Sequence, residues 1–303
     1  MKNIMVVIVG SVALDSVKTK FGSRRGMLGG SVSYACPASS LYAPTGMVGV
    51  VGSDFPAKYI KFYRRKKVDI SGLLVAEGKT FRWSGEYESD MINRRTISTE
   101  LNVFAGFKPN LPEHYKGAPY VLLGNISPAL QLHVLKQMKN PLFVMADTMD
   151  LWIRTEYTNL VNLMKKTTML ALNDSEAREL TGKHDLRQSA DAILRMGPKY
   201  VVIKKGEHGS ILFCKNRIFI IPAYPVLEVA DPTGAGDSFA GGFIGHLAMS
   251  GGINEKNILE SMLIGSVIAS FVVEEFGVNG LERLTKEKVA LRLNKFKKMI
   301  KVF

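Results

Sequence analysis

The residues best suited to chemistry lie between Asp231 and Asp237, in the run D-P-T-G-A-G-D, which continues into S-F-A-G-G-F. Glycines at positions 234 and 236 let the backbone turn sharply and bring successive N–H groups close to a ligand. The small and apolar residues that follow have helical spacing, so they predict a helix that begins near these glycines. N–H groups at the start of a helix are unpaired and partly positive, and they bind anions, phosphate above all.

Asp237 needs an explanation of its own, because a carboxylate beside an anion-binding turn repels the anion. It is well placed to accept the proton of a hydroxyl group that attacks phosphorus. The structural alternative is a glycine turn with Asp237 as a helix cap, and the length of the run favours the chemical interpretation. Residues 226–230, which precede the run, are mostly apolar and predict the edge of a strand.

The whole run resembles the C-terminal signature of the ribokinase (PfkB) family of carbohydrate and nucleoside kinases. The resemblance implies that Asp237 is the catalytic base, and that the amides of Gly234, Ala235 and Gly236 form an anion hole for the transferred phosphoryl group. It extends over nearly the whole chain. It therefore implies an ATP- and Mg²⁺-dependent kinase that phosphorylates a hydroxyl of a sugar or sugar-like small molecule.

An acceptor site is predicted near the N-terminus. Residues 4–9 form a continuous β-branched run that predicts a buried parallel strand, and Asp15 follows it at the end where open α/β sheets bind ligands. Gly29 and Gly30 come next and open a predicted helix that ends at about Leu41. The resemblance implies that Asp15, Gly29 and Gly30 contact the acceptor. The structural alternatives are a capping aspartate and a tight glycine turn.

The predicted helix after Gly30 departs from the family pattern. Ribokinase-type members usually have an asparagine a few residues after the paired glycines, whereas this chain has Tyr34 and Cys36. Pro37 lies inside the predicted helix, where it should kink the helix or mark its true start. The identity of the acceptor therefore cannot be carried over from ribokinase.

Asn173 and Glu176 follow the end of a predicted strand at residues 169–172. The Asn-x-x-Glu spacing is also that of a capping box, which would be purely structural. The family resemblance implies instead that both residues hold a hydrated Mg²⁺ and the nucleotide phosphates. Mg²⁺ prefers oxygen ligands and keeps several waters, so few carboxylates are needed.

Two further segments are predicted to line the nucleotide site. The loop K-x-G-x-x-G contains Lys204, Gly206 and Gly209, and the resemblance implies that it borders the nucleotide. Lys204 or its neighbour Lys205 could neutralise phosphate, or could be a solvated charge in a hairpin. Asn279 follows a long predicted helix, near where family members bind adenine and often a monovalent cation such as K⁺. A plain helix C-cap at Gly277 is the alternative.

Residues 80–107 mix aromatic side chains with arginines in a roughly alternating pattern, which predicts exposed antiparallel strands. The resemblance implies that these strands and residues 16–28 form a lid over the acceptor. Exposed aromatics there could stack on a ligand, or could bury a contact between the lids of a homodimer. We expect a neutral or mildly modified sugar as acceptor. The alternatives are a nucleoside, stacked on Phe81, Trp83 or Phe104, and an anionic sugar, bound by Arg82, Arg94 or Arg95.

The bulk composition fits this hypothesis. We expect a single domain over residues 1–303, with an α/β ribokinase-like three-layer fold in which a mostly parallel sheet lies between helices. The two cysteines are far apart, as expected in a reducing cytoplasm. The chain has no uninterrupted apolar run of about 18 residues, so we expect no membrane span.

The net charge of +13 would attract a nucleotide triphosphate. Specific nucleic-acid binding is not expected, because the lysines of residues 286–301 alternate with apolar residues, as on a solvated helix face. A sugar-binding regulator without catalysis is disfavoured, because the base and the anion-hole glycines are all present.

Overall fold

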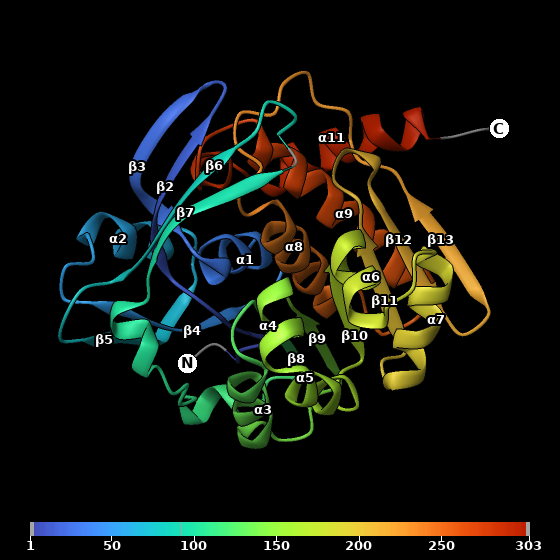
Figure 1. The fold of residues 1–303 in the computed structure, drawn as a ribbon, viewed down its shortest axis with the longest axis horizontal. Helices are drawn as coiled ribbons and strands as arrows, with labels where there is room; N and C mark the ends of the chain where they lie inside the picture. Colours follow the sequence, from blue (N-terminus) through green and yellow to red (C-terminus); the bar gives the residue numbers. More distant parts are fainter. Residues whose placement is uncertain (1–2, 92, 301–303) are drawn as a thin grey trace.

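The computed structural model describes residues 3–91 and 93–300, which fold around a nine-stranded sheet (Figure 1). Its inner strands are parallel, and the strands β12 and β13 form an antiparallel hairpin at one edge. From that edge the strands are β13 (Arg217–Ile221), β12 (Ser210–Cys214), β11 (Tyr200–Lys204), β10 (Met169–Asn173), β9 (Phe143–Asp147), β8 (Tyr120–Leu123), β1 (Val6–Val9), β4 (Thr45–Gly52) and β5 (Asp69–Ala76).

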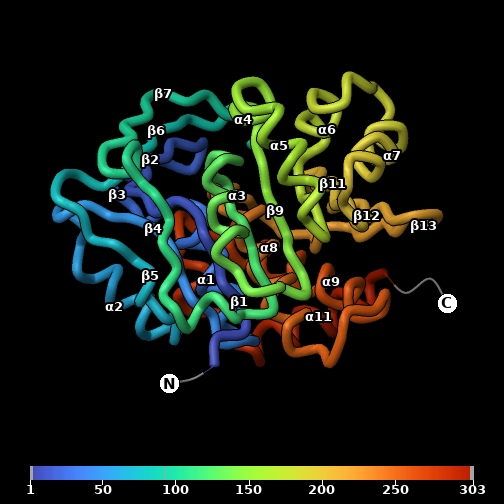
Figure 2. The backbone as a smooth tube through the Cα atoms, turned by 90° about the horizontal axis from the view of Figure 1, so that it is seen from below, coloured from blue at the N-terminus to red at the C-terminus, as the bar shows by residue number. Residues whose placement is uncertain are grey.

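Helices cover both faces of this sheet because its inner strands are apolar on both faces. One apolar core lies beneath α1 (Ser31–Ser40), α2 (Ala57–Arg65), α8 (Ala235–Met249), α9 (Glu255–Val273), α10 (Asn279–Glu282) and α11 (Lys286–Met299). The other lies beneath α3 (Pro128–Gln137), α4 (Asp150–Thr155), α5 (Tyr157–Met164), α6 (Asp174–Thr181) and α7 (Leu186–Met196). In Figure 2 the strands β11–β13 lie between α6 and α7 on one side and α9 and α11 on the other. The predicted three layers are therefore present.

A second, four-stranded sheet stands to one side of the large one (Figure 1). Its strands, in spatial order, are β3 (Gly22–Gly29), β2 (Ala13–Thr19), β6 (Phe81–Tyr87) and β7 (Arg94–Glu100). Both segments predicted to form lid strands, residues 16–28 and 80–107, contribute to it. Its role as a lid stays a prediction.

Two local predictions were wrong. Residues 226–230 form a loop and not a strand, because Val229 packs against the small sheet and Leu227 is 99% exposed. Pro37 does not mark a helix start, because α1 begins at Ser31 and continues through the proline. Strand β5 was not predicted from the sequence, and Lys301 of the predicted C-terminal helix lies outside the described residues.

Among the described residues, α9 alone is long and apolar enough to cross a membrane. It is a core helix, because 56% of its most apolar window is buried and it packs against α8 and α11.

Candidate active site

The turn that precedes α8 has the geometry expected of an anion hole. Gly234 has a φ of +77°, a left-handed conformation that favours glycine, and α8 begins at the next residue. The Ala235 N–H donates a long hydrogen bond of 3.3 Å to the Pro232 carbonyl. A phosphate oxygen that accepted from this N–H would therefore replace only a weak bond. The turn therefore presents helix-start amides beside Asp237, as predicted.

Asp231 fixes this turn to the end of α9. Its carboxylate is fully buried and accepts hydrogen bonds from the Thr233 and Gly277 N–H groups, each at 2.9 Å. The Thr233 hydroxyl also contacts the Tyr87 hydroxyl of the small sheet at 3.2 Å. The first aspartate of the run is thus a structural anchor that ties the turn to α9, while Thr233 ties it to the small sheet.

Asp237 lies in the first turn of α8 and is poised to exchange a proton. Burial raises the pKa of Asp237 to about 6, the charge of Asp147 acts in the same direction, and Lys204 and Arg94 oppose it. A base is most effective when its pKa lies near the working pH. Near pH 7, Asp237 is therefore a carboxylate in most molecules and still has appreciable affinity for a proton.

Asp15 is buried on β2 with its Oδ1 atom lacking any hydrogen-bond partner among the described residues. Its other oxygen lies against Gly29, where an added Cβ would stand only 1.9 Å from Oδ2. Burial raises the pKa of Asp15 to about 7; the Gly30 amide opposes this, and the charges of Asp231 and Asp237 add to it. Buried polar atoms are normally paired, so an orphaned carboxylate oxygen points to a ligand hydroxyl.

The sheet register brings three more polar side chains to one edge. Asn173 at the end of β10 pairs with Lys204 at the end of β11, and Asp147 ends β9 on the other side. The Lys204 Nζ atom lies 3.2 and 3.0 Å from the two Asp147 oxygens. It also lies 3.1 Å from where a Cβ on Gly236 would stand, so its charge borders the anion hole.

The pair of Asp147 and Lys204 is a feature that sequence reasoning found only in part. Burial opposes the charge on Lys204, but Asp147, Glu176 and Asp237 outweigh it and raise the pKa of this lysine above its ordinary value. Lys204 was predicted and Asp147 was missed. The available signal was an acid directly after a buried strand, at the edge where the other predicted residues gather.

Asn173 and Glu176 form the predicted capping box. The Glu176 N–H donates to Asn173 Oδ1 at 2.8 Å, and the Asn173 N–H donates to Glu176 Oε2 at 2.7 Å. Burial raises the pKa of Glu176 to about 7, Lys204 opposes this and Asp147 adds to it. The structural interpretation is therefore confirmed. The metal role stays a prediction that the capping box does not exclude, because Glu176 uses only one of its two oxygens.

The remaining nucleotide-site predictions are untested. Gly206 begins the short 3₁₀ helix η3 (Gly206–His208) and Gly209 follows it, both with positive φ. Lys205 is only partly buried and bonds through its backbone to Gly209. Asn279 is exposed at the start of α10, two residues after Gly277, the glycine that Asp231 holds.

The small sheet sorts the candidate acceptor residues by face. Asp15 pairs with Trp83, and Tyr87 pairs with Arg94, so these side chains share one face. Arg94 lies over the Trp83 ring, and its charge acts on both Asp15 and Asp237.

The other candidate side chains of this sheet are engaged elsewhere. Arg82 pairs with Asp54 at 2.7 Å, and Arg95 pairs with Glu86 at 3.1 Å. Phe81 stacks on Phe104, with 5.3 Å between the ring centroids. Of the predicted aromatics and arginines, Trp83 and Arg94 contact each other and lie on the face that carries Asp15.

Comparison with known proteins identifies the chain. Residues 5–283 match the model of the pfkB family carbohydrate kinases. The chain belongs to the PfkB family. This PfkB kinase is 30% identical over 246 residues to a cytidine kinase of Thermococcus kodakarensis, an alignment that covers 79% of this chain and 87% of that protein. It is also 30% identical over 141 residues to a nucleoside kinase of Methanocaldococcus jannaschii, which covers 45% and 42% of the two chains.

Solved structures confirm the ribokinase-like fold of this PfkB kinase. The nucleoside kinase of Methanocaldococcus jannaschii, described as an archaeal member of the ribokinase family, superposes with a TM-score of 0.78 at 23% identity and covers 97% of this chain and 99% of that one. A nucleoside kinase of Burkholderia thailandensis in complex with inosine superposes with a TM-score of 0.81 at 19% identity. The match covers 96% of this chain and 98% of that one.

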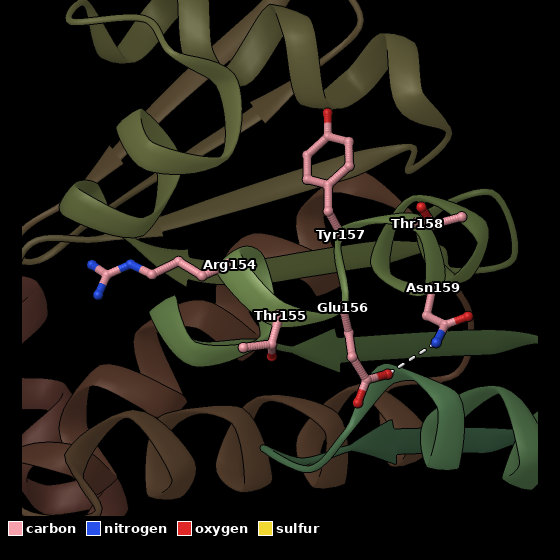
Figure 3. A pocket seen from close by; sticks show the side chains of 6 residues that line it. All are labelled: Arg154, Thr155, Glu156, Tyr157, Thr158 and Asn159. Atoms are coloured by element: carbon pink, nitrogen blue, oxygen red, sulfur yellow. Dashed lines mark hydrogen bonds between the residues drawn. The ribbon is translucent and has the colours of Figure 1, made fainter.

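A shallow pocket of about 310 Å³ elsewhere on the kinase is not part of this site. It lies beside α4 and α5, and Figure 3 shows its lining side chains at residues 154–159. Glu156 accepts hydrogen bonds from the Asn159 amide at 3.0 Å and from the Ser127 hydroxyl at 2.6 Å. Glu156 thus links Ser127, which precedes α3, to Asn159 of α5.

The first prediction separates the two roles of Glu176. Glu176→Gln keeps an oxygen that can accept the Asn173 N–H bond, so the capping box and the thermal midpoint should survive. It removes a negative charge from a predicted Mg²⁺ site. Changes beside a metal commonly cost about 10–100-fold in affinity, so the Mg²⁺ concentration for half-maximal rate should rise at least about tenfold.

Glu176→Ala is the matched comparison, because it loses both the charge and the capping bond. It should show the same shift in Mg²⁺ requirement as Glu176→Gln, together with a lower thermal midpoint. An unchanged Mg²⁺ requirement in both variants, with a stability loss confined to alanine, would leave Glu176 as a capping residue only.

Proposed function

We propose that this kinase transfers the γ-phosphoryl group of ATP to a hydroxyl of a nucleoside, with Asp237 as the base. The observation that carries the proposal is that Asp237, in the first turn of α8 after the Gly234–Gly236 turn, lies close enough to the buried Asp15 for its charge to raise the pKa of Asp15. One carboxylate has an orphaned oxygen for an acceptor hydroxyl, and the other has a proton affinity suited to general-base catalysis.

The chemistry assigned to each residue follows from its place. Asp15 accepts a hydrogen bond from the acceptor and orients it. Asp237 takes the proton of the attacking hydroxyl as the oxygen–phosphorus bond forms. The Gly234–Gly236 amides and the Lys204 ammonium group stabilise negative charge on the transferring group. These contributions are mainly positioning and electrostatics, which is how phosphoryl transfer is usually catalysed.

Mg²⁺ fits the oxygen donors of Asn173 and Glu176 when it keeps part of its water shell. The described residues contain no group of three or more His, Cys, Asp or Glu side chains that could hold a metal by themselves. The bound ion would supply charge neutralisation at the phosphate oxygens. Gly206, Gly209 and Asn279 are proposed to border the nucleotide, and a K⁺ site near Asn279 stays a prediction.

A nucleoside is favoured over the neutral sugar expected from the sequence. Trp83 lies on the face of the small sheet that carries Asp15, where its ring can stack on a base. The similarity to a cytidine kinase over most of both chains supports the same choice. The small sheet would then act as the lid, with Asp15 holding the ribose and Trp83 the base.

An anionic sugar is the second candidate, and Arg94 is the observation that favours it. Its guanidinium acts on both Asp15 and Asp237, so it could reach a phosphate or carboxylate on the acceptor. The predicted homodimer through the small sheet remains open as well. Ile97 on its edge strand β7 is 55% exposed and Leu101 just beyond is 46% exposed, which leaves apolar surface for a partner copy.

The second prediction separates the acceptor classes. For a nucleoside kinase, Trp83→Ala should lower kcat/KM for cytidine at least about tenfold, equivalent to roughly 1.4 kcal/mol, because base stacking is worth about 1–3 kcal/mol. The same variant should barely change the weaker turnover of free ribose, which has no base to stack.

Arg94→Ala provides the contrast, since it removes the charge and keeps the indole. If the natural acceptor is anionic, Arg94→Ala should lower kcat/KM more for ribose 5-phosphate than for cytidine. If the acceptor is a nucleoside, it should not. A Trp83→Ala variant that loses less than about threefold with cytidine, with unchanged oligomeric state, would reject the nucleoside assignment.

A further inference from the structure

Helix α1, which follows Gly29 and Gly30, and helix α8, which carries Asp237, pack with their backbones in direct contact. A Cβ added at Gly241 of α8 would stand 2.1 Å from the Ala35 carbonyl oxygen, and one at Gly245 would stand 2.5 Å from that of Ser39. Such contact leaves no layer of side chains that could deform between α1 and α8. A displacement of either helix must therefore move the other.

Tyr34 lies at the catalytic end of this contact. A Cβ added at Gly234 would stand 2.4–2.5 Å from three carbons of the Tyr34 ring, so the ring lies directly against the turn of the anion hole. Tyr34 is 2% exposed. It belongs to the first turn of α1, and this helix begins directly after Gly29 and Gly30. The Tyr34 ring of α1 thus packs directly against Gly234.

The phenol group is suited to be a neutral support. Burial raises the pKa of Tyr34 well above its ordinary value, and the charges of Asp231, Asp15 and Asp237 all add to this effect. A phenolate is therefore excluded beside these carboxylates at any working pH. The residue can fill space against the turn without adding a charge.

We propose that the Tyr34 ring is a positioning residue for phosphoryl transfer: it holds the Gly234 turn at the height at which its amides meet the transferring group. The inference rests on the proposed function, since it assumes that this turn is the anion hole. It assigns the effect to the flat ring and not to the hydroxyl. It also gives a role to a residue at which the chain departs from ribokinase-type kinases.

Tyr34→Leu removes the flat support and should lower kcat at least about tenfold, because displacements of about 1 Å in a catalytic site can cost up to about 10²-fold. The KM values for ATP and for the acceptor should each stay within about threefold. Tyr34→Phe keeps the ring and should retain kcat within about twofold. Tyr34→Met, which fills a similar volume without a flat face, should behave like leucine and serves if the leucine variant does not fold.

Tyr63→Leu is the matched control. Tyr63 is also fully buried and also contacts α1, through a 2.8 Å bond to the Ser33 hydroxyl, but it belongs to α2. Its loss should lower the thermal midpoint about as much as Tyr34→Leu and leave kcat unchanged. A Tyr34→Leu enzyme with wild-type kcat, or a Tyr34→Phe enzyme as slow as the leucine variant, would overturn the inference.

The measurements use cytidine, inosine and ribose as acceptors and also follow transfer from ATP to water. Water transfer needs the anion hole but no acceptor. If the wild-type protein transfers only to water, the proposed acceptor class fails, and the Tyr34 variants are still ranked by their water-transfer rates. If an acceptor is phosphorylated equally well by wild type and Tyr34→Leu, the inference fails and the proposed function stands.

Discussion

Replacing Asp237 with asparagine is expected to lower kcat by about 10²–10⁴-fold, the usual contribution of a general base. The asparagine amide has the same shape but cannot accept the proton of the attacking hydroxyl. Folding should be preserved, because burial raises the pKa of Asp237 to about 6 and therefore disfavours the charged form that asparagine removes. The measurement is steady-state turnover with an acceptor that the wild-type protein phosphorylates.

Nucleotide binding provides the control for this variant. ATP affinity, measured by calorimetry in the presence of Mg²⁺, should be equal or higher, because a negative charge near the phosphates has been removed. A variant that binds ATP normally and keeps the wild-type kcat would remove Asp237 from its role. It would leave the residue as a helix-start aspartate.

Replacing Asp15 with alanine should raise the acceptor KM by about 10–150-fold, with a smaller change in the KM for ATP. The estimate corresponds to the loss of a hydrogen bond to a charged group, worth about 1.5–3 kcal/mol. The Oδ1 atom of Asp15 is buried and has no hydrogen-bond partner among the described residues, while its Oδ2 atom lies against Gly29, so Oδ1 is left to accept from an acceptor hydroxyl. The effect should appear with every class of acceptor.

Stability distinguishes this role from a structural one. A buried carboxylate with an unpaired oxygen destabilises the free protein, so Asp15→Ala and Asp15→Asn should each melt at the same temperature as wild type or higher. If the role of Asp15 within β2 were purely structural, both variants would melt lower and the acceptor KM would not change. That outcome would transfer the acceptor contact to other residues.

The glycine turn before α8 and the capping box could be predicted because each is a local pattern. The glycine spacing between Asp231 and Asp237 predicts a turn that opens a helix, and Asn173 and Glu176 bond each other across three residues. The buried strands were recognisable from their apolar runs. These features depend on neighbours in the sequence and need no knowledge of the tertiary structure.

The rest of the site depends on register and long-range packing, which the sequence does not display. Asp147 meets Lys204 because β9 and β11 flank β10 in the sheet, 57 residues apart along the chain. The sequence does not distinguish Arg82 from Arg94 as candidate ligands. In the folded small sheet Arg82 pairs with Asp54, whereas the charge of Arg94 acts on Asp15. The contact of Tyr34 with Gly234 likewise arises only when α1 packs on α8.

The pH dependence of kcat for wild type and Asp237→Asn, at saturating ATP, Mg²⁺ and acceptor, tests the central claim most directly. Asp237 must be ionised to accept a proton, and its pKa is about 6. The wild-type rate should therefore fall as the pH drops through about 6, and the residual rate of the variant should lack this decline. Superimposable profiles of similar height would contradict the assignment of Asp237 as the base.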